Sequence, residues 1–205
     1  MFSPLERDLE RGWPGRIDGN EVIQLAAQTL QSFFTGGGQA REHARYRLDE
    51  VVFRAPVLHP PSVRLFDNGD FAFANPAAIV GPDDVVRMPE GAEEVVPVLR
   101  LAAIVGAAER VGAVTQLVEF LAPSLEGAKR RDFALSLGPV VLTEEELPAA
   151  PWSALLAEAG RNTRLVPGDL VAAPGEERTA LRVGDLLEAE IEPFGILRNR
   201  VESRA

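Results

Sequence analysis

Apolar residues beyond position 50 fall in short runs that predict β-strands. Such runs occupy residues 71–74, 78–80 and 85–88, and glycine or proline follows the last two. Residues 95–105 are almost wholly apolar and have the length of a strand buried on both faces, although Arg100 interrupts the run. Short strands separated by turn residues predict a mainly β architecture rather than a parallel sheet of β-α-β units.

The amino-terminal segment combines strand and helix patterns. Residues 13–25 predict a small hairpin that turns at the Asp-Gly-Asn of 18–20, because these residues adopt positive φ at little cost. Apolar positions within 22–34 also fit one helical face, which ends before the three glycines at 36–38. Residues 39–48 are charged and poor in apolar side chains, which predicts a solvated helix or a linker.

The change of character at residue 51 predicts two domains. Residues 1–50 are expected to form a small amino-terminal β/α domain. Residues 51–205 are expected to form a larger, mainly β domain with a few helices, so that the whole chain belongs to the α+β class.

The second half of the chain also carries helix patterns. Residues 111–121 have apolar side chains three and four positions apart, which predicts a helix that ends at Pro123. Residues 152–159 predict another helix, with Gly160 as its C-cap. The glutamates at 144–146 are expected to form a solvated turn or the first turn of a helix.

Composition and charge exclude several classes of function. The chain is 46% hydrophobic and 25% charged, which is typical of a globular protein, and it has no cysteine for a disulfide, a thiolate metal site or a nucleophile. Its formal net charge of −10 disfavours binding to nucleic acids and anionic membranes. The sequence starts without the apolar stretch of a signal peptide, and no run reaches the length of a membrane span, so we predict a cytoplasmic protein.

The spacing of titratable residues predicts no catalytic or metal centre. His43 and His59 have no serine or carboxylate partner at helical or hairpin spacing, so we interpret both as structural or surface residues. The acidic pairs at 83–84, 93–94 and 176–177 lie in polar, turn-rich surroundings and are expected to face water. No enzyme class follows from composition and spacing.

Several segments, taken in order, resemble the fumarylacetoacetate hydrolase superfamily. Residues 129–139, for example, are similar to the Gly-Lys-Asp-Phe-Ala-Thr-Ser-Leu-Gly-Pro segment of that family. Together the matches cover nearly the whole chain. The matching segments are residues 15–19, 56–66, 73–82, 129–139, 152–170 and 181–201.

The resemblance implies a mixed β-sheet roll, commonly dimeric, that follows a small amino-terminal domain. Members of the family hold Mg²⁺ or a similar ion with acidic side chains. They hydrolyse, decarboxylate, hydrate or isomerise small oxo-acids and diketo-acids.

The chain departs from the family pattern where this chemistry is located. Val98-Leu99-Arg100 replaces a Glu-x-Glu on a core strand, so both of its metal-binding carboxylates are missing. A helix that carries a His and a Glu is deleted after Phe66, and residues 115–124 replace a longer segment whose Asn-Asp pair holds the third acidic ligand. The catalytic lysine falls on Arg131, and residues 173–175 replace a Gly-Thr. We therefore predict a shortened, degenerate member with no metal and no cofactor.

Arg100 shares a face of its strand with Val98, because side chains two residues apart point the same way. Two interpretations follow. Arg100 pairs with a core acid such as Asp132, or Arg100 and Arg131 together bind an anionic ligand through their guanidinium forks. No catalytic residue is assigned. The candidate ligand-binding residues are Arg64, Phe66, Arg100, Arg131, Asp132 and Ser136.

Two functions stay open at this point. In the first, the chain is a metal-independent lyase, isomerase or cyclase that acts on a small anionic or carbonyl-containing compound, with catalysis from arginine electrostatics and desolvation. In the second, it is a catalytically inactive homologue that binds a ligand or serves as a partner subunit. The expected macromolecular partner is a second copy of the chain, in a homodimer, or a family paralogue.

Overall fold

The computed structural model describes residues 1–143 and 150–204, so the turn predicted at 144–146 lies outside the described residues. Strands predominate, which confirms the predicted mainly β class. The α-helices of the described part are α1 (Leu30–Thr35) and α2 (Trp152–Gly160). The strands are β1 (Phe2–Pro4), β2 (Gly15–Asp18), β3 (Glu21–Leu25), β4 (Glu42–Arg47), β5 (Val51–Phe53), β6 (Val63–Asp67), β7 (Asp70–Ala74), β8 (Ile79–Val80), β9 (Val85–Arg87), β10 (Val96–Val105), β11 (Val111–Leu121), β12 (Leu135–Leu137), β13 (Leu170–Ala172), β14 (Glu176–Glu177), β15 (Leu186–Glu190) and β16 (Ile196–Glu202).

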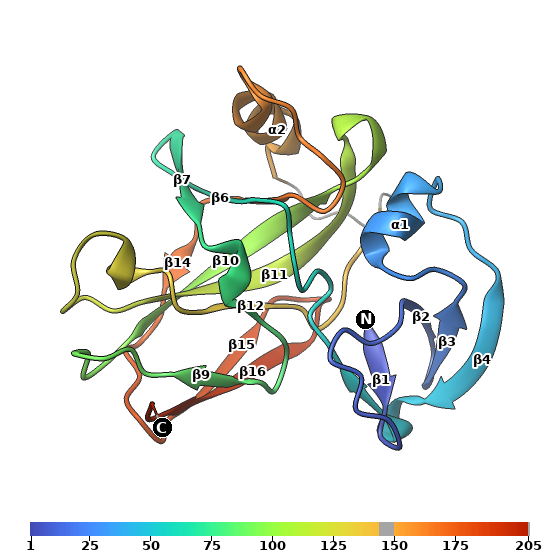
Figure 1. The fold of residues 1–205 in the computed structure, drawn as a ribbon, viewed down its shortest axis with the longest axis horizontal. Helices are drawn as coiled ribbons and strands as arrows, with labels where there is room; N and C mark the ends of the chain where they lie inside the picture. Colours follow the sequence, from blue (N-terminus) through green and yellow to red (C-terminus); the bar gives the residue numbers. More distant parts are fainter. Residues whose placement is uncertain (144–149, 205) are drawn as a thin grey trace.

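The central sheet is mixed and has the order β7-β6-β13-β10-β11-β12-β8, with β14 also paired to β10 (Figure 1). The long hairpin of β10 and β11 is antiparallel, whereas β13 pairs with β6, and β12 with β8, in parallel. The strand predicted from the apolar run at 95–105 is confirmed as β10, and it lies in the middle of the sheet.

The helix predicted over residues 111–121 is wrong, because these residues form β11. Nearly all of β11 is buried, so it lacks the alternation of polar and apolar residues that marks a half-exposed strand. Apolar residues from both of its faces fall three and four positions apart, and this spacing imitates a helical pattern.

The amino-terminal hairpin is confirmed, since β2 and β3 pair around Asp18 and Glu21. The solvated helix or linker predicted at 39–48 is wrong, because residues 42–47 form β4, the third strand of this small sheet. β4 is exposed along most of its length, and its charges pair across strands, as Arg45 does with Glu21 at 3.1 Å. The polar composition of this segment therefore reflects an exposed strand.

The domain boundary at residue 51 stays a prediction. β5, the first strand beyond it, pairs with β1 at the amino terminus. Leu30 and Phe34 of α1 pack into the same apolar cluster as residues of the central sheet. The amino-terminal strands lie beside that sheet in Figure 1.

Apolar clusters cover both faces of the central sheet. Neighbouring residues of β11 point to opposite faces, so Leu117 packs in the cluster that contains α1, while Val118 packs against Leu197 of the three-stranded sheet β15-β16-β9. The helix predicted at 152–159 is confirmed as α2, which packs through Ala159 near one end of the sheet. Its predicted C-cap is wrong, because Gly160 is the last helical residue and Arg161 is the C-cap.

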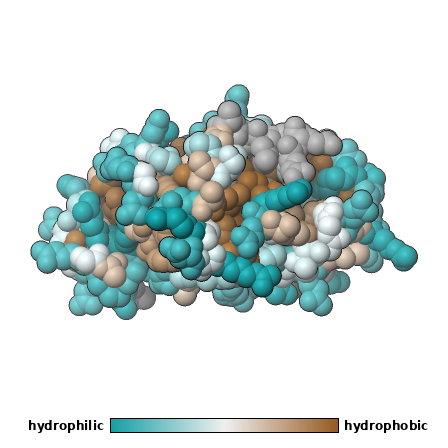
Figure 2. All heavy atoms as spheres, turned by 90° about the horizontal axis from the view of Figure 1, so that it is seen from above, coloured by the Kyte–Doolittle hydropathy of each residue, from teal (hydrophilic) through white to brown (hydrophobic). Residues whose placement is uncertain are grey.

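No helix in residues 1–143 and 150–204 is long and apolar enough to cross a membrane. Figure 2 shows apolar atoms exposed in the middle of the upper face, bordered by hydrophilic side chains. Apolar atoms contribute much of the surface of any folded protein, so this patch alone assigns no function.

Candidate functional site

Arg100 lies at the centre of the fold, midway along β10, with only 3% of its surface exposed. The antiparallel register places it opposite Leu117 and places Val98 opposite Glu119. Side chains two residues apart share a face of a strand, so Val98, Arg100 and Glu119 are neighbours on one face of the sheet.

The guanidinium of Arg100 uses every nitrogen as a donor. Nε and Nη2 donate to Glu119 Oε2 at 3.2 and 2.9 Å, and Nη1 and Nη2 donate to the two carboxylate oxygens of Asp67 at 3.0 and 2.9 Å. Nη1 also reaches the carbonyl oxygens of Phe66 at 3.0 Å and Ala173 at 3.2 Å. An arginine has five N–H groups, so no donor of Arg100 is free for a ligand.

Burial opposes the charge of Arg100, but its bonds to Asp67 and the negative charge of Glu119 outweigh burial and raise the pKa of Arg100 above its ordinary value. Arg100 is therefore protonated at physiological pH.

A second arginine approaches the same carboxylate from the outside. Nη2 of Arg131 lies 2.7 Å from Glu119 Oε1, in an ion pair whose angles are not those of a hydrogen bond. Glu119 is fully buried, whereas Arg131 is 27% and Asp67 47% exposed. We call Asp67, Arg100, Glu119 and Arg131 the charge cluster; its two positive and two negative charges balance.

A tight turn brings Asp67 to the cluster. β6 and β7 form a hairpin in which Asp67 pairs with Asp70, and the two loop residues Asn68 and Gly69 both have positive φ. Asn-Gly is the residue pair favoured in such two-residue loops. From the sequence, this segment was interpreted only as the point where a family helix is deleted, although its Asn-Gly pair is a hairpin signal.

The chain itself covers Arg100. Ala173 accepts one of its hydrogen bonds, and β14 pairs with Val98 and Leu99 of β10. A Cβ added to Gly175 would lie 2.5 Å from Cγ of Arg100 and 2.8 Å from the carbonyl oxygen of Leu99. Residues 173–177 therefore close directly over the arginine.

Gly175→Ala is expected to lower the free energy of unfolding by about 1–3 kcal/mol, because the added methyl group overpacks the space beside Arg100. Denaturant unfolding measures the change. Gly160→Ala is the matched control, since its new Cβ would meet no atom closer than 3.7 Å and a helix favours alanine over glycine. A Gly175→Ala variant as stable as the control would show that residues 173–177 do not pack tightly against Arg100.

The residues of the charge cluster do not fit a divalent cation. Among the described residues, no group of three or more His, Cys, Asp or Glu side chains is placed to hold a metal ion. The guanidinium of Arg100 lies between the carboxylates of Glu119 and Asp67, and a fixed positive charge there repels a cation.

Glu119 is the member of the cluster that the sequence analysis missed. It lies within residues 115–124, where the resemblance places the third acidic ligand, and it is the single charged residue of β11. That isolated charge in an apolar run was the available signal. The helix wrongly predicted there concealed its register with Arg100.

The other candidate residues do not contact Arg100 through the side chains that were predicted to bind a ligand. Asp132 pairs with Lys129 at 2.7 Å rather than with Arg100. Phe66 contributes its carbonyl oxygen, while its ring packs against Phe71. Ser136 is buried on β12 and lies 3.5 Å from the carbonyl oxygen of Gly81, so it has a local structural contact.

Arg64 is buried in a separate environment. It donates to Ser62, which in turn donates to Asp169, and its guanidinium lies over the rings of Phe71 and Phe73. These contacts tie β6 to the turn before β13.

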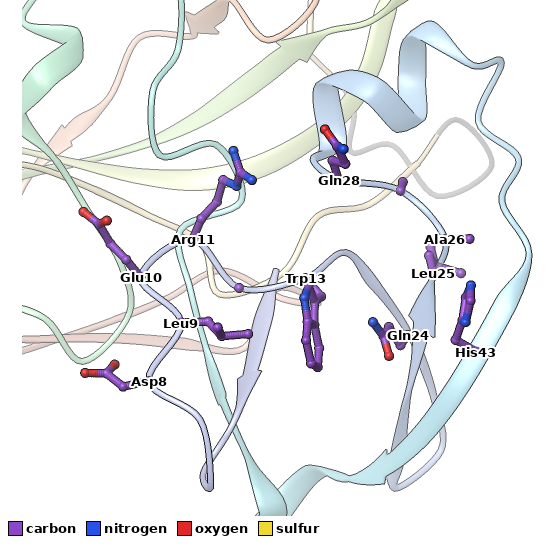
Figure 3. A pocket seen from close by; sticks show the side chains of 12 residues that line it. Asp8, Leu9, Glu10, Arg11, Trp13, Gln24, Leu25, Ala26, Gln28 and His43 are labelled. Atoms are coloured by element: carbon purple, nitrogen blue, oxygen red, sulfur yellow. The ribbon is translucent and has the colours of Figure 1, made fainter.

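The grooves on the described part of the chain include two that are not lined by any residue of the charge cluster. The first, of about 670 Å³, lies between residues 8–13 and 24–28, and the exposed His43 also borders it. Figure 3 shows Trp13, Gln24 and His43 along this groove. The second, of about 660 Å³, lies near β9 and contains Asp132.

No protein-family model matches the chain, and no curated protein is similar to it in sequence. Its structure, however, superposes on that of fumarylacetoacetate hydrolase from Exiguobacterium antarcticum with a TM-score of 0.78 and 20% identity, over 95% of this chain and 96% of the other. The chain has the fumarylacetoacetate hydrolase fold. The predicted mixed β-sheet roll is thereby confirmed.

Other structures with this fold carry different activities. Maleylpyruvate hydrolase from Sphingobium sp. SYK-6, solved with manganese(II) and pyruvate, gives a TM-score of 0.72 at 19% identity over 94% and 97% of the two chains. A 2-hydroxyhepta-2,4-diene-1,7-dioate isomerase from Mycobacterium marinum gives 0.72 at 20% identity over 94% and 93%. The fumarylacetoacetate hydrolase fold therefore does not choose between hydrolysis and isomerisation.

Proposed function

We propose that this chain is a metal-independent protein of the fumarylacetoacetate hydrolase fold that binds a small anionic carbonyl compound and does not hydrolyse it. One observation carries the proposal: Arg100 is buried at the centre of the sheet with all its donors bound to the chain's own oxygens. In this role Arg100 is an internal cation that binds both Glu119 and Asp67 and neutralises one of these two carboxylates.

Simple electrostatics supports the loss of divalent-ion chemistry. Two unit charges 4 Å apart interact by about 4 kcal/mol at the effective dielectric of a protein, so an ion of charge 2+ beside Arg100 would be repelled by about 8 kcal/mol. Arginine cannot relieve this repulsion by losing its proton. Only two carboxylates remain to attract the ion, and Arg100 already neutralises one of them.

The saturation of Arg100 also argues against a catalytic role for this arginine. A metal-free lyase, isomerase or cyclase would need a cation with free donors beside the reacting carbonyl group. Arg100 has none, and Arg131 is the only other arginine in the charge cluster. The catalytic alternative stays a prediction, as does a second copy or a paralogue as partner subunit.

The ligand class follows from the fold's relatives and from charge. The maleylpyruvate hydrolase structure holds pyruvate, which is a small anionic carbonyl compound. The present chain has Arg131 where the resemblance places the catalytic lysine, so a positive side chain suited to a carboxylate is retained at that position.

Thermal unfolding tests the proposal. Pyruvate is expected to raise the Tm equally in EDTA and in Mn²⁺, and Mn²⁺ alone is expected to leave the Tm unchanged. No hydrolysis of an acylpyruvate is expected with Mn²⁺ present. A pyruvate effect that requires Mn²⁺, or metal-dependent turnover, would contradict metal independence.

A further inference from the structure

The groove beside β9 has the size of a small-molecule site. Its volume is about 660 Å³, within the range of roughly 300–1,000 Å³ that is typical of ligand pockets. One wall comes from the residues that follow β9, and the opposite wall comes from the 3₁₀ turn at 127–130 and the residues beside it.

The floor of the groove is apolar and anchored in the core. Met88 is buried, and Leu125 and Phe133 are partly buried in the same cluster as Val118 and Phe120 of β11. These three side chains therefore present a fixed apolar surface to any molecule in the groove. Such a surface suits the hydrocarbon part of a ligand.

The rim of the groove gathers positive side chains in a chain that is strongly negative. Arg87, Lys129 and Arg204 line it, and each has an acidic partner, so the groove is close to neutral while the whole chain carries a formal net charge of −10. An anion is therefore repelled less at this groove than by the molecule as a whole.

Each of these cations has an acidic partner that a ligand could replace. The pairs are Arg87 with Glu202 at 2.7 Å, Lys129 with Asp132 at 2.7 Å, and Arg204 with Glu90 at 3.9 Å. Lys129 and Arg204 are 79% and 71% exposed, and exposed pairs contribute only about 0–1 kcal/mol. The carboxylate of a ligand can therefore accept hydrogen bonds from Lys129 and Arg204 in place of their acidic partners, and no displaced acid is left as a fully buried charge.

Asn75 fixes the segment that lines the inner wall. Its Nδ2 donates to the carbonyl oxygen of Asp132 at 2.9 Å, and its Oδ1 accepts from the backbone N–H of Ala77 at 3.0 Å. Both ends of the amide are thus bound to the chain. The position of Asp132 and Phe133 is set before any ligand arrives, which lowers the entropic cost of binding.

From these contacts we infer that the groove binds a small organic acid with an apolar body. The carboxylate meets Lys129 and Arg204, and the apolar body lies on Met88, Leu125 and Phe133. This inference rests on the proposed function for the class of ligand, an anionic carbonyl compound. It adds the location of the ligand and the requirement for an apolar group.

Calorimetric titration of the full chain with phenylpyruvate tests the inference. In EDTA, phenylpyruvate is expected to bind at least about tenfold more tightly than pyruvate, which lacks the apolar body, or benzyl methyl ketone, which lacks the carboxylate; tenfold corresponds to about 1.4 kcal/mol. Lys129→Gln combined with Arg204→Gln is expected to weaken phenylpyruvate binding about tenfold or more.

The matched control removes two positive charges elsewhere. Arg16 and Arg198 are exposed and pair with Glu42 and Glu188, so Arg16→Gln combined with Arg198→Gln changes the net charge equally and should leave the Kd unchanged. An equal loss of phenylpyruvate affinity in both double variants, or no loss of affinity in either, would overturn the groove as the binding site.

Further outcomes separate the two proposals. Loss of binding in Arg131→Gln alone would place the ligand at the charge cluster, which overturns the groove but leaves metal-independent binding intact. Binding in the groove that requires Mn²⁺ would overturn the proposed function instead. Failure of both acids to bind would overturn both.

Discussion

Replacing Arg100 with leucine is expected to lower the free energy of unfolding by about 3–5 kcal/mol. Glu119 would stay fully buried and lose its two hydrogen bonds from Arg100, keeping only its ion pair with Arg131, and removing one partner of a buried ion pair is strongly destabilising. For a chain of this length the corresponding fall in Tm is about 10 °C. Denaturant and thermal unfolding measure both quantities.

A second substitution separates charge from packing. Arg100→Leu combined with Glu119→Leu removes both buried charges and is expected to recover most of the lost stability, because apolar replacements of buried ion pairs are often tolerated. As a control, Arg198→Gln breaks the exposed ion pair of Arg198 with Glu188, whose atoms lie 2.7 Å apart, and should lower the free energy of unfolding by less than about 1 kcal/mol. If the double variant is as unstable as Arg100→Leu, the charge of Glu119 is not the cause.

Restoring acids at two positions is expected to create a metal site. Val98 lies opposite Glu119 in the register, and Arg100 shares the face of Val98, so Val98→Glu with Arg100→Glu places three carboxylates together. Three converging carboxylates suit a hard divalent cation. At a Mn²⁺ concentration of about 100 times the Kd, the variant should be stabilised by about 2.7 kcal/mol, which is a rise of several degrees in Tm.

The matched control is Val98→Gln with Arg100→Gln, which adds side chains of similar size without charge. It should not respond to Mn²⁺. No hydrolysis is expected from the acidic variant, because the helix to which the resemblance assigns a His and a Glu is absent. An acidic variant that is folded by circular dichroism but indifferent to Mn²⁺ would show that Arg100 does not occupy a cation position.

The central position of Arg100 was predictable, because an arginine within an apolar run of eleven residues has to be buried with partners. Its face was predictable as well, since Val98 and Arg100 alternate with Leu99. Its partners were not. Glu119 is joined to Arg100 only by the register of β10 with β11, and no local pattern of a strand buried on both faces specifies that register.

The remaining errors concern strands that lack the alternation of apolar and polar residues typical of a half-exposed strand. β11 was predicted to be helical because burial on both faces removes the period of two. β4 was predicted to be a helix or linker because exposure of most of its residues removes the apolar face that marks a strand. Local pattern therefore identified β10 and α2, while β11 and the mostly exposed β4 needed the tertiary structure.

The most direct measurement of the role of Arg100 is a titration of the wild-type chain with Mn²⁺, followed by the electron paramagnetic resonance of the free aquo ion. Because Arg100 and Arg131 together already neutralise Glu119 and Asp67, the free-ion signal should rise in proportion to added Mn²⁺, as it does in buffer alone. Loss of one equivalent of free signal, abolished by Glu119→Gln, would show that the cluster still holds a divalent ion.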